Sequence, residues 1–289
     1  MIKCIVCDMD GTLIRYDASI EDKTYHALKE CINQGIEFII ATGRDINMVI
    51  DFLDEYQLDC DLILNNGTQY KNKERTINQI YPMDNESFKK IATILQEKGY
   101  LLAIHTNKGK YSFLDKEDFW DYHMKLLKQM HGDNPIPKST FTTREGYLRD
   151  FHYAKDAQDI INQGIQVLKI DARHIDENVV KGIREQLDID YLDISSSYEA
   201  NMEITTNQSN KGIMLEKVIK EKGYTREEVA VFGDGANDVQ MLEAFPYSFA
   251  PYNASDEAKH AAHFQLSQTN DNGAVYEGIE LLRKKGLIA

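Results

Sequence analysis

The chain of 289 residues is poor in the features that mark disordered, secreted or membrane-spanning proteins. It has only five prolines and no low-complexity tract, which argues against long disordered linkers. Its longest apolar runs, such as 38–41 and 101–104, fall far short of the roughly 20 residues that a membrane span needs. Asp8 interrupts the apolar segment near the start, so we expect no signal peptide, no membrane partner and a cytoplasmic protein.

Positive charge is scarce as well. Lysine and arginine total 33 against 47 aspartates and glutamates, which gives a formal net charge of -14. Such a field repels nucleic acid and anionic membrane surfaces, so we predict neither as a partner. An anionic small substrate is compatible with this charge only where local cations or a metal reverse the sign of the field.

Only four cysteines occur, Cys4, Cys7, Cys31 and Cys60. The first two have the CxxC spacing found in metal and redox sites, but residues three apart on a strand point to opposite faces. We therefore expect no shared zinc ion or disulfide, and interpret the cysteines as small buried residues in a reducing compartment.

Strands and helices alternate over the first part of the chain. The hydrophobic pattern predicts, in turn, a strand, a helix, a strand, a helix and a strand at 2–7, 20–34, 37–41, 45–56 and 61–64. This order predicts right-handed crossovers and a parallel sheet. The same alternation resumes with a helix that begins at Lys211 and a wholly apolar strand at 229–232.

The segment that lies between these two parts has a different pattern. After Pro82 we expect helices at 85–98 and 177–187 and strands at 100–105, 111–114, 166–170 and 191–194. This α+β segment interrupts the parallel pattern. We therefore predict a catalytic core made of residues 1–82 and 198–289, with residues 83–197 inserted as a cap domain that sets substrate specificity.

Three of the predicted parallel strands end in polar residues. The first is followed by Asp8 and Asp10, the second by residues 42–44, and the strand at 229–232 by residues 233–238. Since the carboxyl ends of parallel strands share one edge of a sheet, these segments should converge there. A fourth polar pair, Asn210-Lys211, stands where a helix begins.

The side chains gathered in this way suit phosphoryl transfer. Carboxylate oxygens are hard ligands that suit Mg²⁺, and a lysine with helix N-termini suits a phosphate. Asp8 and Asp10 repel each other unless a cation or a proton lies between them. A metal, a phosphate and a spare carboxylate are the parts that phosphoryl transfer requires.

Each signal alone has a simpler interpretation. An Asp-x-Asp-Gly run is commonly a turn, and Asn66-Gly67 is most simply a turn as well. The spacing after Asp8 does not fit an EF-hand, and Asp238 stands where a dinucleotide fingerprint needs its third glycine. It is the four signals in this order, each at a strand or helix terminus, that indicate one site.

The motifs DMDGT (8–12), ATGR (41–44), NKG (210–212) and GDGANDVQM (233–241) resemble those of the haloacid dehalogenase superfamily. The resemblance covers essentially the whole chain and is to the Cof-type phosphatases, the subclass IIB members with a large C2-type cap between the second and third motifs. It implies a Rossmann-like α/β core with a parallel sheet, an inserted α+β cap, and Mg²⁺-dependent hydrolysis of phosphate esters.

The resemblance also implies a role for each motif residue. Asp8 would be the nucleophile that forms an aspartyl-phosphate, and Asp10 the general acid for the leaving alcohol and then the base for water. Phosphate binding is implied for Thr42, the amide of Gly43, Lys211 and Asn237. A catalytic role is also implied for Lys211, which would hold the charge of Asp8 and of the phosphoryl group. Metal binding is implied for Asp8, the backbone carbonyl of Asp10, Asp234 and Asp238.

Three roles stay open within this resemblance. Asn237 would either contact the phosphate or orient Lys211. Asp238 would bind the metal either directly or through a water molecule. Arg44 would either form a structural salt bridge or face the substrate.

Two other functions also stay open. A phosphomutase of similar fold would return the phosphoryl group to a sugar. A receiver-type phosphoacceptor module, which is not an enzyme, also brings aspartates, Mg²⁺, threonine and lysine to strand ends. Asp10 argues against that module because a neighbouring general base would hydrolyse a signalling phosphate. We expect a monomer or homodimer whose substrate is a small phosphate monoester, such as a sugar phosphate or a related phosphometabolite.

Overall fold

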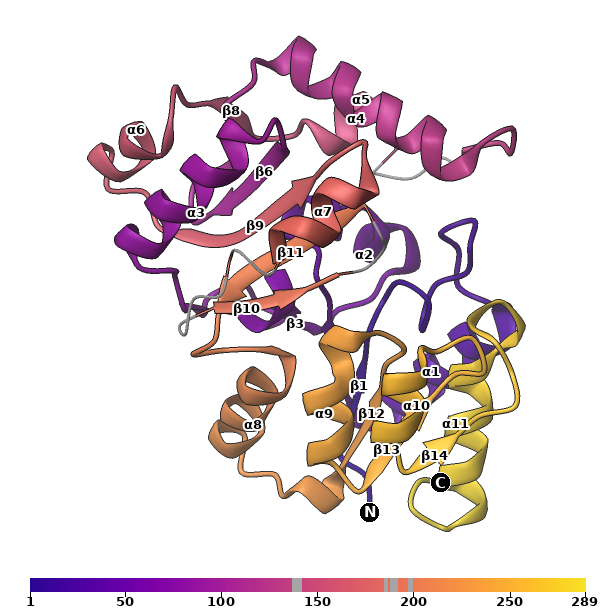
Figure 1. Cartoon of the computed structure of the whole chain (residues 1–289). Helices are drawn as coiled ribbons and strands as arrows, with labels where there is room; N and C mark the ends of the chain where they lie inside the picture. The colour runs from indigo at the N-terminus through magenta and orange to yellow at the C-terminus, as the bar shows by residue number, and fades with distance from the viewer. Residues whose placement is uncertain (137–141, 185–186, 188–191, 197–199) are drawn as a thin grey trace. The chain divides into compact units, whose positions relative to one another are not determined.

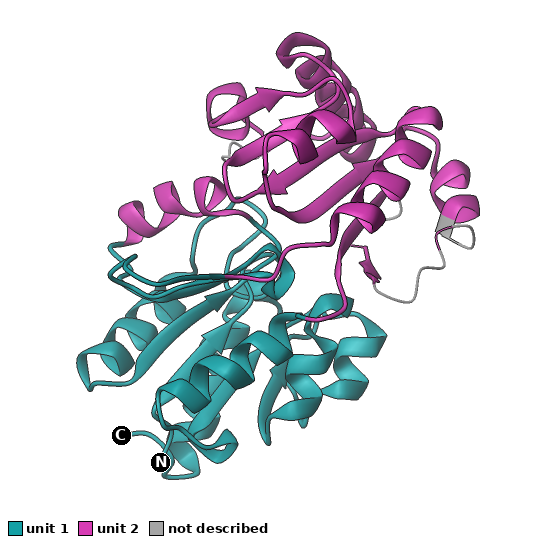
Figure 2. Ribbon diagram, turned by 90° about the vertical axis from the view of Figure 1, so that its left-hand side faces the viewer, with its two compact units in different colours: residues 1–44, 57–79, 209–289 teal, residues 45–56, 80–208 magenta. Residues whose placement is uncertain are grey.

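A computed structural model describes residues 1–136, 142–184, 187, 192–196 and 200–289. The chain forms two compact units (Figure 2). Unit 1 comprises residues 1–44, 57–79 and 209–289, and unit 2 comprises residues 45–56 and 80–208. Unit 2 includes three described segments that the sequence analysis assigned to the core, residues 45–56, 80–82 and 200–208.

Unit 1 is built on an eight-stranded sheet with the order β14-β13-β12-β1-β2-β3-β4-β5. Strands β1, β12, β13 and β14 of this sheet are labelled in Figure 1. Its strands are β1 (Cys4–Cys7), β2 (Glu37–Ala41), β3 (Asp61–Leu64), β4 (Gln69–Lys71), β5 (Asn78–Ile80), β12 (Val229–Phe232), β13 (Tyr247–Ala250) and β14 (Phe264–Gln265). The six strands from β14 to β3 pair in parallel, whereas β4 runs antiparallel to β3. β1 lies between β12 and β2.

Helices pack on this sheet and explain its apolar strands. They are α1 (Asp22–Asn33), α8 (Lys211–Glu221), α9 (Val239–Ala244), α10 (Asp256–Ala261) and α11 (Ala274–Lys284), with short 3-10 turns η2 (Asn65–Gly67), η3 (Arg226–Glu228), η4 (Ala236–Asp238) and η5 (Asn270–Asn272). α1 packs against α11, and α8 against α9. Every residue of β1, β3 and β12 is buried, as expected for parallel strands that are covered on both faces.

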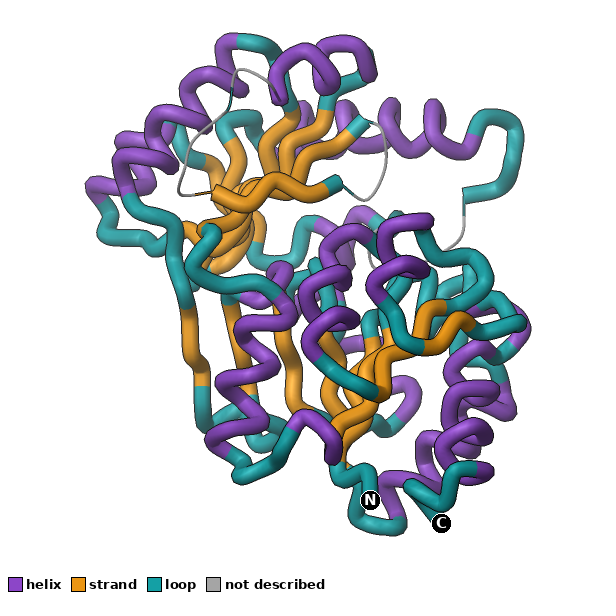
Figure 3. Tube along the Cα trace, turned by 60° about the horizontal axis from the view of Figure 1, so that its bottom comes forward, coloured by secondary structure: helices purple, strands orange, loops and turns teal. Residues whose placement is uncertain are grey.

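Unit 2 contains a six-stranded sheet with the order β10-β11-β9-β6-β7-β8, whose strands are drawn in orange in Figure 3. The strands are β6 (Leu101–Thr106), β7 (Gly109–Ser112), β8 (Phe151–Tyr153), β9 (Val167–Arg173), β10 (Leu192–Ser195) and β11 (Asn201–Thr206). The helices are η1 (Ile46–Met48), α2 (Ile50–Tyr56), α3 (Asn85–Glu97), α4 (Lys116–His131), α5 (Arg144–Tyr147), α6 (Ala157–Asn162) and α7 (Glu177–Arg184).

The two faces of this second sheet differ. One face carries the main apolar core of unit 2, to which α3, α6 and α7 contribute. The other carries a smaller apolar cluster, made with η1, α4 and α5, beside buried charged residues. On β9, Lys169, Asp171 and Arg173 are all buried. Burial alone would raise the pKa of Asp171, but Arg173, which donates to both of its carboxylate oxygens, helps lower that pKa to about 2.

The predicted α/β class, with a parallel-rich sheet interrupted by an α+β segment, is confirmed. The predicted helix 45–56 is divided into η1 and α2. The sequence pattern missed several elements, of which β11 is the longest strand. Residues 185–186 of the predicted helix 177–187, and residue 191 of the predicted strand 191–194, lie outside the described part. Within that part, the structure contains no helix that is both long and apolar enough to cross a membrane.

Candidate active site

The predicted motif residues all belong to unit 1. Three of the four motifs lie where its central strands β1, β2 and β12 end, and the fourth lies at the start of α8. Asp8 follows β1, and its amide donates to the carbonyl of Phe232, the last residue of β12 (2.9 Å). Thr42 follows β2, and its amide donates to the carbonyl of Ile63 in β3 (2.8 Å). Three neighbouring parallel strands therefore carry the site at their carboxyl ends, as the sequence predicted.

A buried lysine joins two of the predicted aspartates. The Nζ of Lys211 donates to the Oδ1 of Asp8 (2.6 Å) and to the Oδ1 of Asp238 (2.7 Å). Lys211 is the first residue of α8, whose N-cap is the side chain of Asn210. Burial raises the pKa of Asp8, and the adjacent Lys211 ammonium opposes that effect. Burial would lower the pKa of Lys211, but Asp238 and Asp8 raise it above its ordinary range.

A third aspartate completes an acidic cluster. One carboxylate oxygen from each of Asp8, Asp234 and Asp238 lies within 4.8 Å of the others. Burial and the nearby Asp238 raise the pKa of Asp234 to about 7, although Thr12 donates a hydrogen bond to its Oδ1 (2.6 Å). Carboxylates this close repel each other, and a divalent cation with a preference for oxygen ligands relieves that repulsion.

Gly11 allows this close packing. Its φ is 78°, and a Cβ there would lie 2.3 Å from the Oδ2 of Asp234. A larger residue would push the DMDGT loop away from Asp234. The glycine of this motif is therefore required by the backbone and by the space beside the acidic cluster.

Both oxygens of Asp238 have protein donors. Its Oδ1 accepts from Lys211, and its Oδ2 accepts from the backbone amides of Asp234 and Gly235, both at 3.0 Å. Asp238 is completely buried. It therefore fixes both the lysine and the loop that carries Asp234.

Asp10 lies apart from this buried group. Its side chain is 57% exposed and pairs with Arg44, whose Nη2 is 2.6 Å from the Oδ1 of Asp10. Thr42 is buried, and its Oγ1 accepts from the amide of Arg44 (3.2 Å). Gly43, which stands between Thr42 and Arg44 in the sequence, is half-buried. Arg44 thus forms a salt bridge with Asp10, and its role toward the substrate stays a prediction.

Asn66 was missed as part of the site. The Nδ2 of Asn237 donates to the Oδ1 of Asn66 (3.0 Å), and Asn66 is buried. The signal in the sequence was the Asn-Asn-Gly run at the end of a predicted strand, which we interpreted as a simple turn.

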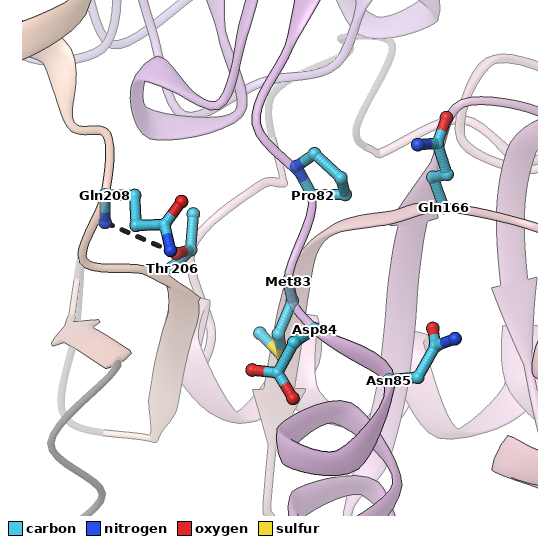
Figure 4. A pocket seen from close by; sticks show the side chains of 7 residues that line it. All are labelled: Pro82, Met83, Asp84, Asn85, Gln166, Thr206 and Gln208. Carbon is cyan, nitrogen blue, oxygen red and sulfur yellow. Dashed lines mark hydrogen bonds between the residues drawn. The ribbon is translucent and has the colours of Figure 1, made fainter.

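A pocket of about 330 Å³ lies within unit 2 (Figure 4). Its lining residues are Pro82, Met83, Asp84, Asn85, Gln166, Thr206 and Gln208. None of them belongs to the predicted motifs, so this pocket is distinct from the acidic cluster of unit 1.

Comparison with known proteins identifies the family. A family model described as haloacid dehalogenase-like hydrolase matches residues 5–279. The chain belongs to this family. Its members are hydrolases, so the expected enzyme class is confirmed, and the motif resemblance is confirmed with it.

Individual relatives are similar over nearly their whole length. The 5-amino-6-(5-phospho-D-ribitylamino)uracil phosphatase YwtE of Bacillus subtilis is 28% identical over 286 residues, which are 95% of this chain and 96% of that protein. A haloacid dehalogenase-like hydrolase from B. subtilis has a similar structure, with a TM-score of 0.83 and 22% identity over 97% of this chain and 100% of that one. The subclass IIB sugar phosphatase BT4131 has a TM-score of 0.74 and 22% identity, covering 99% and 100%.

Proposed function

We propose that this hydrolase is a Mg²⁺-dependent phosphatase that hydrolyses small phosphate monoesters through an aspartyl-phosphate on Asp8. The observation that carries the proposal is the buried arrangement of Asp8, Lys211 and Asp238, with Asp234 beside it. A carboxylate next to a lysine and an acidic cluster is suited to attack phosphorus and to hold the transferred charge.

The acidic cluster fits a divalent cation. Asp8, Asp234 and the backbone carbonyl of Asp10 would hold Mg²⁺, and we assign Asp238 to the support of Lys211 and of the loop because both of its oxygens are engaged. When bound, Mg²⁺ neutralises charge on the carboxylates and on the phosphoryl group.

The reaction would proceed in two steps. A carboxylate oxygen of Asp8 attacks phosphorus, the ester P–O bond breaks, and Asp10 gives its proton to the leaving oxygen. Asp10 then takes a proton from water, which attacks the phosphorus of the aspartyl-phosphate and releases inorganic phosphate and free Asp8. Thr42, the amide of Gly43, Lys211 and Asn237 would hold the phosphoryl oxygens throughout.

The natural substrate would be a phosphorylated small metabolite. The name of YwtE specifies a phosphorylated ribitylamino-uracil, and BT4131 is described as a sugar phosphatase. Both substrate classes carry a phosphate on a polyhydroxy chain. A panel of sugar phosphates, nucleotides, flavin mononucleotide and pyridoxal phosphate, ranked by kcat/KM, would identify the class that this chain prefers.

The proposal is tested with p-nitrophenyl phosphate. We expect hydrolysis in the presence of Mg²⁺, loss of activity with EDTA, and loss of nearly all activity in Asp8→Asn with an unchanged circular dichroism spectrum. Asp54→Asn, on an exposed position of α2, is the matched control and should retain full activity. Robust turnover by Asp8→Asn would refute the nucleophile.

A further inference from the structure

The segment Asn65–Gly67 has an unusual backbone. Three consecutive residues at the end of β3 have positive φ values, 51° for Asn65, 58° for Asn66 and 93° for Gly67. Left-handed backbone is unfavourable for a residue that has a Cβ, although asparagine tolerates it better than most. Such a run persists only where the surroundings hold it in place, and that is typical of functional sites.

The turn is bound by its backbone to the predicted phosphate-binding loop. The amide of Asn65 donates to the carbonyl of Arg44 (3.0 Å), and the amide of Asn66 donates to the carbonyl of Thr42 (3.1 Å). The left-handed conformation thus gives two hydrogen bonds to the loop that follows β2, and those bonds fix the position of Thr42.

The turn also contacts the start of α8. The Oγ of Ser209 donates to the carbonyl of Gly67 (2.6 Å), and a Cβ on Gly67 would lie 2.1 Å from the carbonyl carbon of Asn210. Only a glycine allows this approach. Because Lys211 is the next residue, Gly67 helps to determine where the lysine enters the site.

The side chain of Asn66 reaches a third motif. Its Oδ1 accepts from the Nδ2 of Asn237, so one donor hydrogen of the Asn237 carboxamide is committed and the direction of the group is fixed. Asn66 is 5% exposed, which limits competition from water. One short turn therefore contacts the segments of Thr42, Lys211 and Asn237.

We propose that residues 65–67 form a positioning turn for the phosphate site, and that Asn66 is a positioning residue that orients the Asn237 carboxamide toward the phosphate. This assignment rests on the proposed phosphatase function. Asn66 does not touch the reacting atoms, so its effect should pass through Asn237.

The test uses Asn66→Gly, which accepts the left-handed backbone and removes the side chain that carries the carboxamide. We expect kcat/KM for p-nitrophenyl phosphate to fall by about 10- to 100-fold, as for other residues that orient a binding group. The inhibition constant of inorganic phosphate, and its dissociation constant measured by calorimetry with Mg²⁺, should both rise. The melting temperature should change little.

A matched control separates the carboxamide from the backbone. Gln57 also has a positive φ, 48°, and is exposed, so Gln57→Gly makes the same backbone change at a surface position. It should leave both phosphate affinity and kcat/KM unchanged.

A double-mutant cycle then tests the route of the effect. If Asn66 acts through Asn237, adding Asn66→Gly to Asn237→Ala should cause little further loss. Full additivity of the two losses, or unchanged phosphate affinity in Asn66→Gly, would overturn the positioning role while the wild-type activity still supports a phosphatase. A wild-type protein that neither hydrolyses the ester nor binds phosphate would overturn the proposed function, and this assignment with it.

Discussion

Both carboxylate oxygens of Asp10 accept hydrogen bonds from Arg44, with Nε at 2.8 Å from Oδ2 and Nη2 at 2.6 Å from Oδ1. A bidentate guanidinium stabilises the ionised carboxylate. The proposed first step, however, needs Asp10 to carry a proton. The pair therefore favours the form of Asp10 that accepts a proton from water and disfavours the form that protonates a leaving group.

Arg44→Gln should change the pH dependence of the enzyme. Without the guanidinium, the two hydrogen bonds that stabilise the ionised carboxylate of Asp10 are lost. The alkaline decline of kcat/KM for an alkyl phosphate should therefore move to higher pH. p-Nitrophenyl phosphate, whose leaving group needs no proton, should show a smaller change. Arg149→Gln is the matched control, because Arg149 makes the same bidentate pair with Asp51 within unit 2. An unchanged alkaline limb in Arg44→Gln would contradict this account.

Asp10→Asn should discriminate between leaving groups. An amide cannot donate the proton that an alkoxide needs, so kcat for alkyl phosphates should fall by about 100- to 10,000-fold. With p-nitrophenyl phosphate, the rate of the first step should fall less, because its leaving group needs no proton. Rapid-quench experiments measure this rate as a burst of p-nitrophenol. Equal losses in the rate at which the leaving group departs, for good and poor leaving groups alike, would remove the acid role from Asp10.

The acidic cluster should make the metal-free protein sensitive to pH. Burial and Asp238 raise the pKa of Asp234 to about 7, so the folded state binds more protons than the unfolded state between about pH 4 and pH 7. The stability of the metal-free protein should therefore fall as pH rises through this window. Calorimetry in EDTA should show a melting temperature that decreases by a few degrees, and Mg²⁺ should restore it at pH 7. Asp234→Asn should melt higher than the wild type in EDTA at pH 7 and lose the response to Mg²⁺. A melting temperature independent of both pH and Mg²⁺ would contradict the proposed metal site.

Two helical glycines should respond oppositely to the same substitution. In α11, a Cβ on Gly278 would lie 2.3 Å from Cε1 of the Phe232 ring, so Gly278→Ala should destabilise by about 1–3 kcal/mol. In α7, nothing lies within 4 Å of the corresponding position on Gly182, so Gly182→Ala should stabilise by up to about 1 kcal/mol. Urea denaturation measures both. Equal effects at the two positions would show that helix propensity, and not the contact with Phe232, decides the outcome.

The parallel core was largely predictable from the sequence because its strands are short, apolar and bounded by glycines or helix caps. β2, β3 and β12 have the predicted bounds, and α8 begins at the predicted Lys211. Their order then required the polar strand ends to meet at one edge. The contact between Lys211 and Asp8 confirms that these segments meet, although their chemical roles remain predictions.

Unit 2 was less predictable because its sheet buries polar residues. β11 alternates apolar Met202 and Ile204 with polar side chains, and its polar face is buried beside that of β9. A pattern that equates polar residues with solvent exposure overlooks such a strand, although the alternation over residues 201–205 was a usable signal. The pairing of Asp171 with Arg173 depends on tertiary burial, which local sequence does not reveal.

The place of β1 between β2 and β12 also affects the nascent chain. When the ribosome has completed residues 4–41, one edge of β1 already has its partner, but the other edge stays open until residues 229–232 are made. An open strand edge is a template for pairing with another chain. Premature termination inside the second unit would therefore yield a fragment with an exposed central strand and with Asp8 lacking its lysine. Such fragments should aggregate or be degraded, and they should not accumulate as partly active enzyme.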